Sequence, residues 1–213
     1  MSHPDRRYTE AEYLALEDAA PYKSEYVNGR IYAMSGGSEG HNQIVFNLTG
    51  EVRGQIRGRP CRGFNESTRV RVTATGGYFY PDLSALCGRP EWYGEGAIKM
   101  LVNPSTIVEV LSPTTADFDR GDKFGHYRRI PALDEYLILE QDRVLAELRV
   151  RAGDVWTLRV LTGLDDVVEL PSVGCALRLR DLYEGVEFPA DAAPRAPRLL
   201  REEAAEAYAA GPA

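Results

Sequence analysis

The sequence predicts a mixed α/β protein in which helices flank a central mixed β-sheet and extra β-hairpins follow at the C-terminal end. Helix-type and strand-type patterns alternate in the first half, and strands dominate the second. A β-branched run at 107–111 is typical of a strand buried on both faces. The 213 residues are 44% hydrophobic, and a chain of this length buries a core without needing disulfides.

The first half begins with a capping box, Thr9-Glu10-Ala11-Glu12, which predicts a short helix. The Asn28-Gly29 pair between apolar segments predicts a β-hairpin over 25–34. Apolar residues at spacings of three and four then predict an amphipathic helix over 41–57. Alternating patterns at 68–72 and 78–86 predict two strands of one sheet, and a loop follows at 88–96.

The second half begins with the buried strand at 107–111, and Thr115 or Asp117 caps the helix expected to run to about Ile130. Strands follow at 135–139, as a pair within 143–161, and at 167–170 and 176–179. We expect one domain over 1–189. The segment 190–213 is rich in Ala, Pro, Arg and Glu, and we expect it to be an appendage to this domain with a helix at 202–210.

Charge and cysteine content narrow the classes of function. The net charge of −7 excludes a globally basic nucleic-acid-binding domain, so phosphate contacts must be local. Three separated cysteines argue against a disulfide framework and a zinc site, and favour a reducing cytoplasm. No apolar run approaches about 20 residues, which argues against a membrane partner. Basic residues concentrate in two stretches, Arg53, Arg57, Arg59 and Arg62, then Arg120, Lys123, Arg128 and Arg129.

Two carboxylates are candidates for chemistry. Glu109 stands between two valines inside the buried strand, where a lone charge is costly unless a cation compensates it. Asp82 follows Pro81 at a strand end, and two carboxylates suit Mg²⁺. The alternative is structural: Asp82 caps a turn and Glu109 pairs with an arginine. Lys123 either makes an i,i+4 surface pair with Asp119 or turns toward Glu109 to orient water or hold a phosphate.

A set of ordered motifs resembles the Uma2 family (DUF820) of the PD-(D/E)xK nuclease superfamily. The resemblance extends from the Thr9 helix to about Phe188 and implies a restriction-endonuclease-like core over 1–189. The matching motifs are Pro81-Asp82, Val108-Glu109-Val110-Leu111-Ser112-Pro113, Asp119, Asp122-Lys123, Tyr127 and Glu135-Tyr136.

The resemblance implies a site. Asp82, Glu109 and the Val110 carbonyl match the superfamily's ligands for Mg²⁺ (or Mn²⁺), and Glu25 matches an auxiliary acid. Leu111 departs from the pattern, because a lysine is expected there; Lys123 on the following helix is the matching substitute. Tyr127 lies one turn after it, and His41 either contacts phosphate or water or caps a helix.

The leading hypothesis is a metal-dependent endonuclease acting on DNA, with Arg53, Arg57 and Arg120 as backbone contacts. A homodimer would align two basic strips. The alternative is a non-catalytic nucleic-acid-binding or regulatory module that retains the nuclease fold. A third reading, a carboxylate-pair hydrolase of small molecules such as glycosides, has the resemblance against it.

Overall fold

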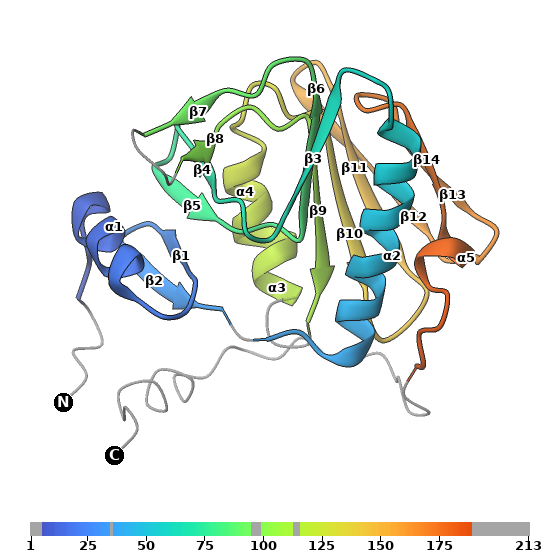
Figure 1. Ribbon diagram of the computed structural model, residues 1–213, viewed down its shortest axis with the longest axis horizontal. Helices are drawn as coiled ribbons and strands as arrows, with labels where there is room; N and C mark the ends of the chain where they lie inside the picture. Colours follow the sequence, from blue (N-terminus) through green and yellow to red (C-terminus); the bar gives the residue numbers. More distant parts are fainter. Residues whose placement is uncertain (1–5, 35, 95–98, 113–115, 189–213) are drawn as a thin grey trace.

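The computed structural model describes residues 6–34, 36–94, 99–112 and 116–188, and it contains two six-stranded sheets and a two-stranded hairpin (Figure 1). The main sheet has the order β12-β11-β10-β9-β6-β3. Its strands are β3 (Cys61–Asn65), β6 (Leu83–Cys87), β9 (Thr106–Leu111), β10 (Glu135–Glu140), β11 (Ala146–Ala152) and β12 (Val155–Leu161).

The second sheet has the order β2-β1-β5-β4-β8-β7, and the hairpin pairs β13 with β14. The strands of the second sheet are β1 (Ser24–Val27), β2 (Arg30–Ala33), β4 (Val70–Val72), β5 (Gly77–Phe79), β7 (Trp92–Tyr93) and β8 (Met100–Leu101). The remaining elements are β13 (Val167–Leu170), β14 (Cys175–Arg178), α1 (Glu10–Ala19), α2 (Glu39–Ile56), α3 (Ala116–Phe118), a π-helical turn η1 (Asp119–Lys123), α4 (Phe124–Tyr127) and α5 (Leu179–Leu182).

Helix α2 covers one face of the main sheet (Figure 1). Its buried residues are Ile44, Leu48, Val52 and Ile56, so the predicted apolar stripe is confirmed. The helix begins at Glu39 because the Ser38 hydroxyl accepts the His41 N–H at 3.1 Å. The opposite face packs against α3, α4 and strands of the second sheet. Both faces of β9 are therefore buried, as its sequence predicted.

The N-terminal predictions are also confirmed. Thr9 and Glu12 form the capping box of α1. The turn between β1 and β2 places Asn28 at φ 51° and Gly29 at φ 84°. Both values lie in the left-handed region that a tight hairpin turn requires, and asparagine and glycine tolerate it best.

One predicted strand is wrong as a single element. Residues 78–86 divide at Pro81-Asp82 into β5 and β6, which belong to different sheets. Proline supplies no N–H to a ladder and holds the preceding residue extended, so the chain leaves one sheet there and enters the other. Strands β3, β7 and β8 were not predicted, since β3 reads Cys-Arg-Gly-Phe-Asn without alternation and the other two span two residues each.

The helix predicted to reach Ile130 is shorter and irregular. It consists of α3, the π-helical turn η1 and α4, and it ends at Tyr127. Asp117 lies inside α3 rather than at its cap, and Thr115 lies outside the described residues, as do segment 190–213 and its expected helix. Insertion of a π turn changes which side chains face inward, which has consequences for Lys123.

The expectation of unpaired cysteines is wrong for two of the three. Cys61 and Cys87 are direct partners across antiparallel strands β3 and β6 and form a disulfide, whereas Cys175 is free and buried. The 26-residue separation between them hides this pairing, because only the strand register brings the two residues together. In the part of the chain that the structure describes, no helix combines the length and apolar character needed to cross a membrane.

Candidate active site

Asp82 and Glu109 come together where β6 begins. Leu83 pairs with Val108 in the antiparallel β6–β9 ladder, so Asp82, the residue before β6, lies next to the part of β9 that carries Glu109. Oδ2 of Asp82 accepts the Val110 N–H at 2.7 Å, which fixes this carboxylate against β9.

Lys123 completes a buried charged cluster with three carboxylates. Its Nζ lies 3.2 Å from Oε1 of Glu109 and 3.0 Å from Oε1 of Glu25, which comes from β1 in the second sheet. Oδ1 of Asp119 lies 3.0 Å from the same ammonium. The side chains of all four are at most 7% exposed. The i,i+4 pair of Lys123 with Asp119 exists, but it is buried, so the interpretation as a surface pair is wrong. The ammonium does turn toward Glu109, as the other interpretation required.

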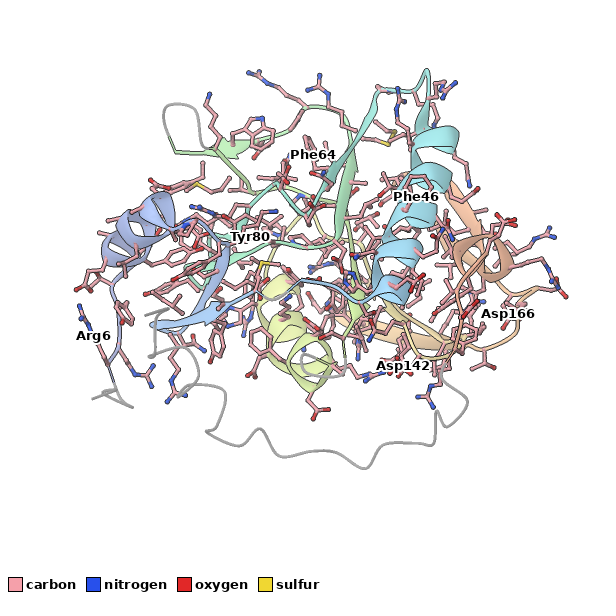
Figure 2. The ribbon with its side chains drawn as sticks, turned by 60° about the horizontal axis from the view of Figure 1, so that its bottom comes forward. Arg6, Phe46, Phe64, Tyr80, Asp142 and Asp166 are labelled. Atoms are coloured by element: carbon pink, nitrogen blue, oxygen red, sulfur yellow. A yellow bond between two sulfur atoms is a disulfide. The ribbon has the colours of Figure 1, made fainter. Side chains whose placement is uncertain are left out.

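Neutral donors hold these carboxylates in place. The Tyr127 hydroxyl donates to Oε1 of Glu109 at 2.9 Å, so that one oxygen receives both the tyrosine and the lysine. The backbone N–H of Tyr80, a residue labelled in Figure 2, donates to Oε1 of Glu25 at 3.1 Å. The Tyr136 hydroxyl donates to the Asp119 carbonyl at 2.9 Å and supports η1 from β10. The site is thus assembled from both sheets and from the π-helical turn.

Burial and charge shift the titration of this cluster. Burial raises the pKa of Glu109 well above its ordinary value, against the opposing charge of Lys123, and the carboxylates of Asp119, Asp82 and Glu25 raise it further. Burial also raises the pKa of Glu25. For Lys123, burial disfavours the charged form, but the surrounding carboxylates outweigh it and hold its pKa well above the usual range. The lysine is therefore a fixed positive charge.

His41 extends the cluster from the first turn of α2. Its Nε2 lies 3.4 Å from Oδ1 of Asp82, while its backbone N–H, not its side chain, is used by the helix cap. Burial opposes protonation of this imidazole, yet the hydrogen bond and charge of Asp82 raise its pKa above the ordinary value. The structure thus brings His41 to the carboxylates.

The donor chemistry of the cluster fits a hard divalent cation. Among the described residues, no group of three or more His, Cys, Asp and Glu side chains is arranged to hold a metal ion. Mg²⁺ does not require one, because it keeps several waters and binds through one or two carboxylates. Asp82 and Glu109 are such a pair. Within the described ranges, Nδ1 of His41 is buried without a hydrogen bond, as expected where a ligand or water completes a site.

The predicted arginine contacts do not join this cluster. Arg53 and Arg57 lie exposed on α2 and beyond its end. Arg120 pairs instead with Glu140, and its Nε lies 2.7 Å from Oε1 of Glu147. The second basic stretch therefore does not form one free strip, because Lys123 is buried and Arg120 is paired.

Sequence reasoning gave Asp119 no role beyond a surface pair, and it missed the supporting groups of Tyr80 and Tyr136. The i,i+4 spacing of Asp119 and Lys123 was the available signal for the first. Tyr136 lies in the Glu135-Tyr136 motif of the resemblance, but its bond to a backbone carbonyl was not predicted. No sequence signal marks Tyr80, which acts through its backbone N–H.

Comparisons with known proteins identify the family of the chain. Residues 10–180 match the Uma2 family, described as “Putative restriction endonuclease”. Two relatives come from Synechocystis sp. (strain ATCC 27184 / PCC 6803 / Kazusa). “Uncharacterized protein sll1609” is 37% identical over 162 residues, covering 76% of this chain and 91% of the relative. “Uncharacterized protein slr1290” is 32% identical over 187 residues, covering 88% of this chain and 97% of the relative.

A solved structure shows the fold independently. It is titled “Crystal structure of a putative nuclease belonging to DUF820 from Anabaena variabilis ATCC 29413”, and it superposes with a TM-score of 0.68 at 22% identity. The superposition covers 82% of this chain and 97% of the other. The predicted fold class, a mixed sheet flanked by helices with a nuclease-like core, is therefore confirmed.

Proposed function

The chain belongs to the Uma2 family, a family of restriction-endonuclease type, and we propose that it is a metal-dependent endonuclease that hydrolyses phosphodiester bonds of DNA. One observation carries the proposal: the Asp82 carboxylate is bonded to the N–H of Val110, the residue after Glu109, and the Lys123 ammonium lies 3.2 Å from Glu109. Two carboxylates and a lysine are the groups that the superfamily pattern requires.

In this proposal Asp82, Glu109 and the Val110 carbonyl hold Mg²⁺ or Mn²⁺, which supplies a Lewis acid and lowers the pKa of bound water. Leu111 shares the sheet face of Glu109 two residues on, but it is buried and cannot donate a hydrogen bond. Lys123 takes the place of the missing lysine and orients Glu109 and the attacking water. Glu25 holds the ammonium from the other sheet.

His41 and Tyr127 have supporting roles in the same proposal. His41, next to Asp82, is placed to hold a phosphate oxygen or a water, and its raised pKa favours the donor form. Tyr127 is buried on Oε1 of Glu109, so it positions that carboxylate rather than contacting DNA. Arg53 and Arg57, exposed on the α2 side, are retained as contacts to the DNA backbone, and Arg120 would first have to leave its two carboxylates.

One observation favours a second candidate function, a non-catalytic nucleic-acid-binding or regulatory module. Three carboxylate oxygens already surround the Lys123 ammonium within 3.2 Å, so its charge is compensated before any phosphate arrives. A buried network of this kind can serve stability and fold specificity alone. The two functions differ in whether metal-dependent turnover occurs.

The test is nicking of supercoiled plasmid in Mg²⁺, Mn²⁺ or EDTA. Glu109→Gln and Asp82→Asn preserve side-chain shape and remove the proposed ligands. Glu135→Gln is the matched control, because Glu135 is also a buried strand carboxylate but is bonded to Thr106 and Ser172. We expect metal-dependent nicking by the wild type and the control, and loss of at least about 100-fold in the two ligand variants.

The contradicting results are equally defined. Equal nicking by all four proteins would indicate a contaminating nuclease and remove the support for this site. DNA binding without nicking in either metal would favour the non-catalytic module. Circular dichroism of each variant shows whether a loss of activity reflects a loss of folding.

A further inference from the structure

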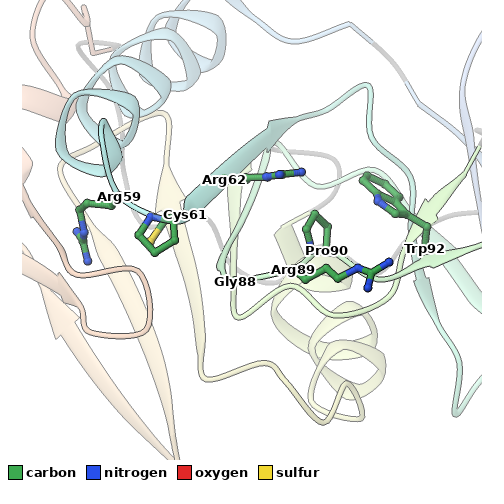
Figure 3. A pocket seen from close by; sticks show the side chains of 8 residues that line it. Arg59, Cys61, Arg62, Gly88, Arg89, Pro90 and Trp92 are labelled. Carbon is green, nitrogen blue, oxygen red and sulfur yellow. The ribbon is translucent and has the colours of Figure 1, made fainter.

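A second polar site lies near Cys87, at the end of β6 that is remote from Asp82. Figure 3 shows this site from close by. It is a depression of about 610 Å³ that opens to solvent. Its lining residues are Arg59, Pro60, Cys61, Arg62, Gly88, Arg89, Pro90 and Trp92. Three of the eight are arginines and none is acidic, although the whole chain carries a net charge of −7. The concentration of positive charge there therefore runs against the overall composition.

The backbone of this arginine pocket is fixed. The Cys61–Cys87 disulfide joins the two strands that bear its walls, and the Gly88 N–H donates to the Pro60 carbonyl at 2.7 Å. Arg59 donates to the Gly174 carbonyl at 2.9 Å, so its guanidinium is held beside the pocket. A preorganised cationic pocket loses less entropy when it binds an anion.

Arg62, Arg89 and Trp92 form the open part of the pocket. All three side chains are exposed, and the two arginines reach toward the indole (Figure 3). Phe64 holds Trp92 edge-on, with ring centroids 5.4 Å apart, and the indole remains 40% exposed. Glu91 precedes Trp92 in the chain but does not line the pocket. Guanidinium groups beside an exposed aromatic face are typical of surfaces that bind nucleic-acid strands.

Strand register places this pocket on the same sheet face as the carboxylates. Arg62 pairs with Leu86, and Phe64 pairs with Ser84. Ser84 in turn pairs with Ile107, which shares its face with Glu109. Five residues of β6 separate Asp82 from Cys87, which at about 3.3 Å per residue is roughly 17 Å. The second sheet and α4 cover the face between the two places, so a DNA strand that reaches both would follow the protein surface around them.

We propose that the pocket of Arg62, Arg89 and Trp92 is a second DNA-binding site, which holds backbone phosphates at a distance from the bond that is cut. The inference rests on the proposed function, because it takes DNA as the substrate of the carboxylate site. Arg62 and Arg89 bind phosphate oxygens, and Trp92 contacts the adjoining sugar or base. The site compensates for the acidic net charge of the protein.

The test is the salt dependence of DNA binding, measured in EDTA so that no cleavage occurs, with a fluorescent duplex of 20 base pairs. Two lost phosphate contacts reduce the slope of log K against log salt by about 1.8. We expect this reduction for Arg62→Ala/Arg89→Ala, with binding weakened about tenfold or more. Arg62→Lys/Arg89→Lys retains the charge and most of the slope.

The matched control is Arg159→Ala/Arg180→Ala, which removes two exposed arginines on β12 and α5. Its slope should equal that of the wild type. In a Trp156→Phe background, binding should also quench the fluorescence of Trp92. An unchanged slope for the Arg62 and Arg89 variant, or an equal change in the control, overturns the inference.

Metal-dependent nicking distinguishes this inference from the proposed function. If the wild type nicks DNA and the slope of Arg62→Ala/Arg89→Ala is unchanged, the DNA-binding role of the pocket is refuted and the endonuclease proposal stands. An altered slope without nicking supports the pocket and refutes the catalytic proposal.

Discussion

Replacing Lys123 by methionine tests whether the charged cluster is built around that ammonium. The side chain is 7% exposed and lies within 3.2 Å of three carboxylate oxygens. Methionine fills a similar volume but leaves buried negative charge without a partner. Removing one member of a buried ion pair costs about 3–5 kcal/mol. Because the free energy of unfolding of a domain is only about 5–15 kcal/mol, this one change should remove a large part of the stability.

The cost should depend on pH in a defined direction. Without Lys123, no positive charge opposes the burial that raises the pKa of Glu109, so this carboxyl binds its proton more tightly when folded than when unfolded. The folded state then holds more protons, and the free energy of unfolding falls as pH rises above the ordinary value of 4.5. Lys123→Met should therefore be less destabilising at pH 5 than at pH 8.

Urea unfolding in EDTA measures these quantities. We expect Lys123→Met to lower the free energy of unfolding by about 3–5 kcal/mol at pH 8, and Lys123→Met/Glu109→Gln to regain at least about 1 kcal/mol. Lys23→Met is the control, because Lys23 makes a half-exposed pair with Glu66 at 3.8 Å and should cost less than about 1 kcal/mol. A Lys123 variant as stable as this control, or a double variant no more stable than the single one, would refute the reasoning.

Three further predictions concern single contacts. Tyr127→Phe removes the donor at 2.9 Å from Glu109 and should cost about 2 kcal/mol in urea unfolding; a cost near zero would contradict a bonded hydroxyl. A thiol assay of the denatured chain without reductant should detect one free thiol, Cys175, and three free thiols would contradict the disulfide. Reduction of the disulfide, whose cysteines are 26 residues apart, should lower the free energy of unfolding by about 3.5 kcal/mol. Burial lowers the pKa of His126, so the histidine contributes fully to the free energy of unfolding above pH 6.5, and this contribution falls as pH drops through the lowered pKa. The free energy of unfolding of His126→Gln should therefore depend less on pH between 7 and 5 than that of the wild type.

The sequence could predict elements whose signals are local. Four apolar residues at helical spacing defined α2, and the β-branched run defined β9 as a strand buried on both faces. Asp82 and Glu109 were candidates because a carboxylate in or beside a buried strand needs a partner. The resemblance to a known family identified them as a pair, and the structure places Asp82 beside the same stretch of β9, bonded to the Val110 N–H.

What could not be predicted depends on contacts between distant segments. The direction of Lys123 follows from a π-helical turn, and nothing in the residues 119–123 distinguishes such a turn from ordinary helix. The disulfide depends on the register of β3 against β6. The short strands β7 and β8 form because neighbouring strands pair with them, which tertiary context decides.

The segment Tyr80-Pro81-Asp82 explains why the cluster forms between the two sheets. Pro81 ends pairing with the second sheet and directs the chain into β6. On one side of this proline the Tyr80 N–H holds Glu25 from β1, and on the other side Asp82 accepts the Val110 N–H of β9. These three residues therefore set the positions of the Glu25 and Asp82 carboxylates. The Lys123 ammonium lies between Glu25 and Glu109 and forms an ion pair with each. Because a backbone N–H donates to the carboxylate at each end of this segment, the fold itself holds Glu25 and Asp82 in place, as a preorganised site requires.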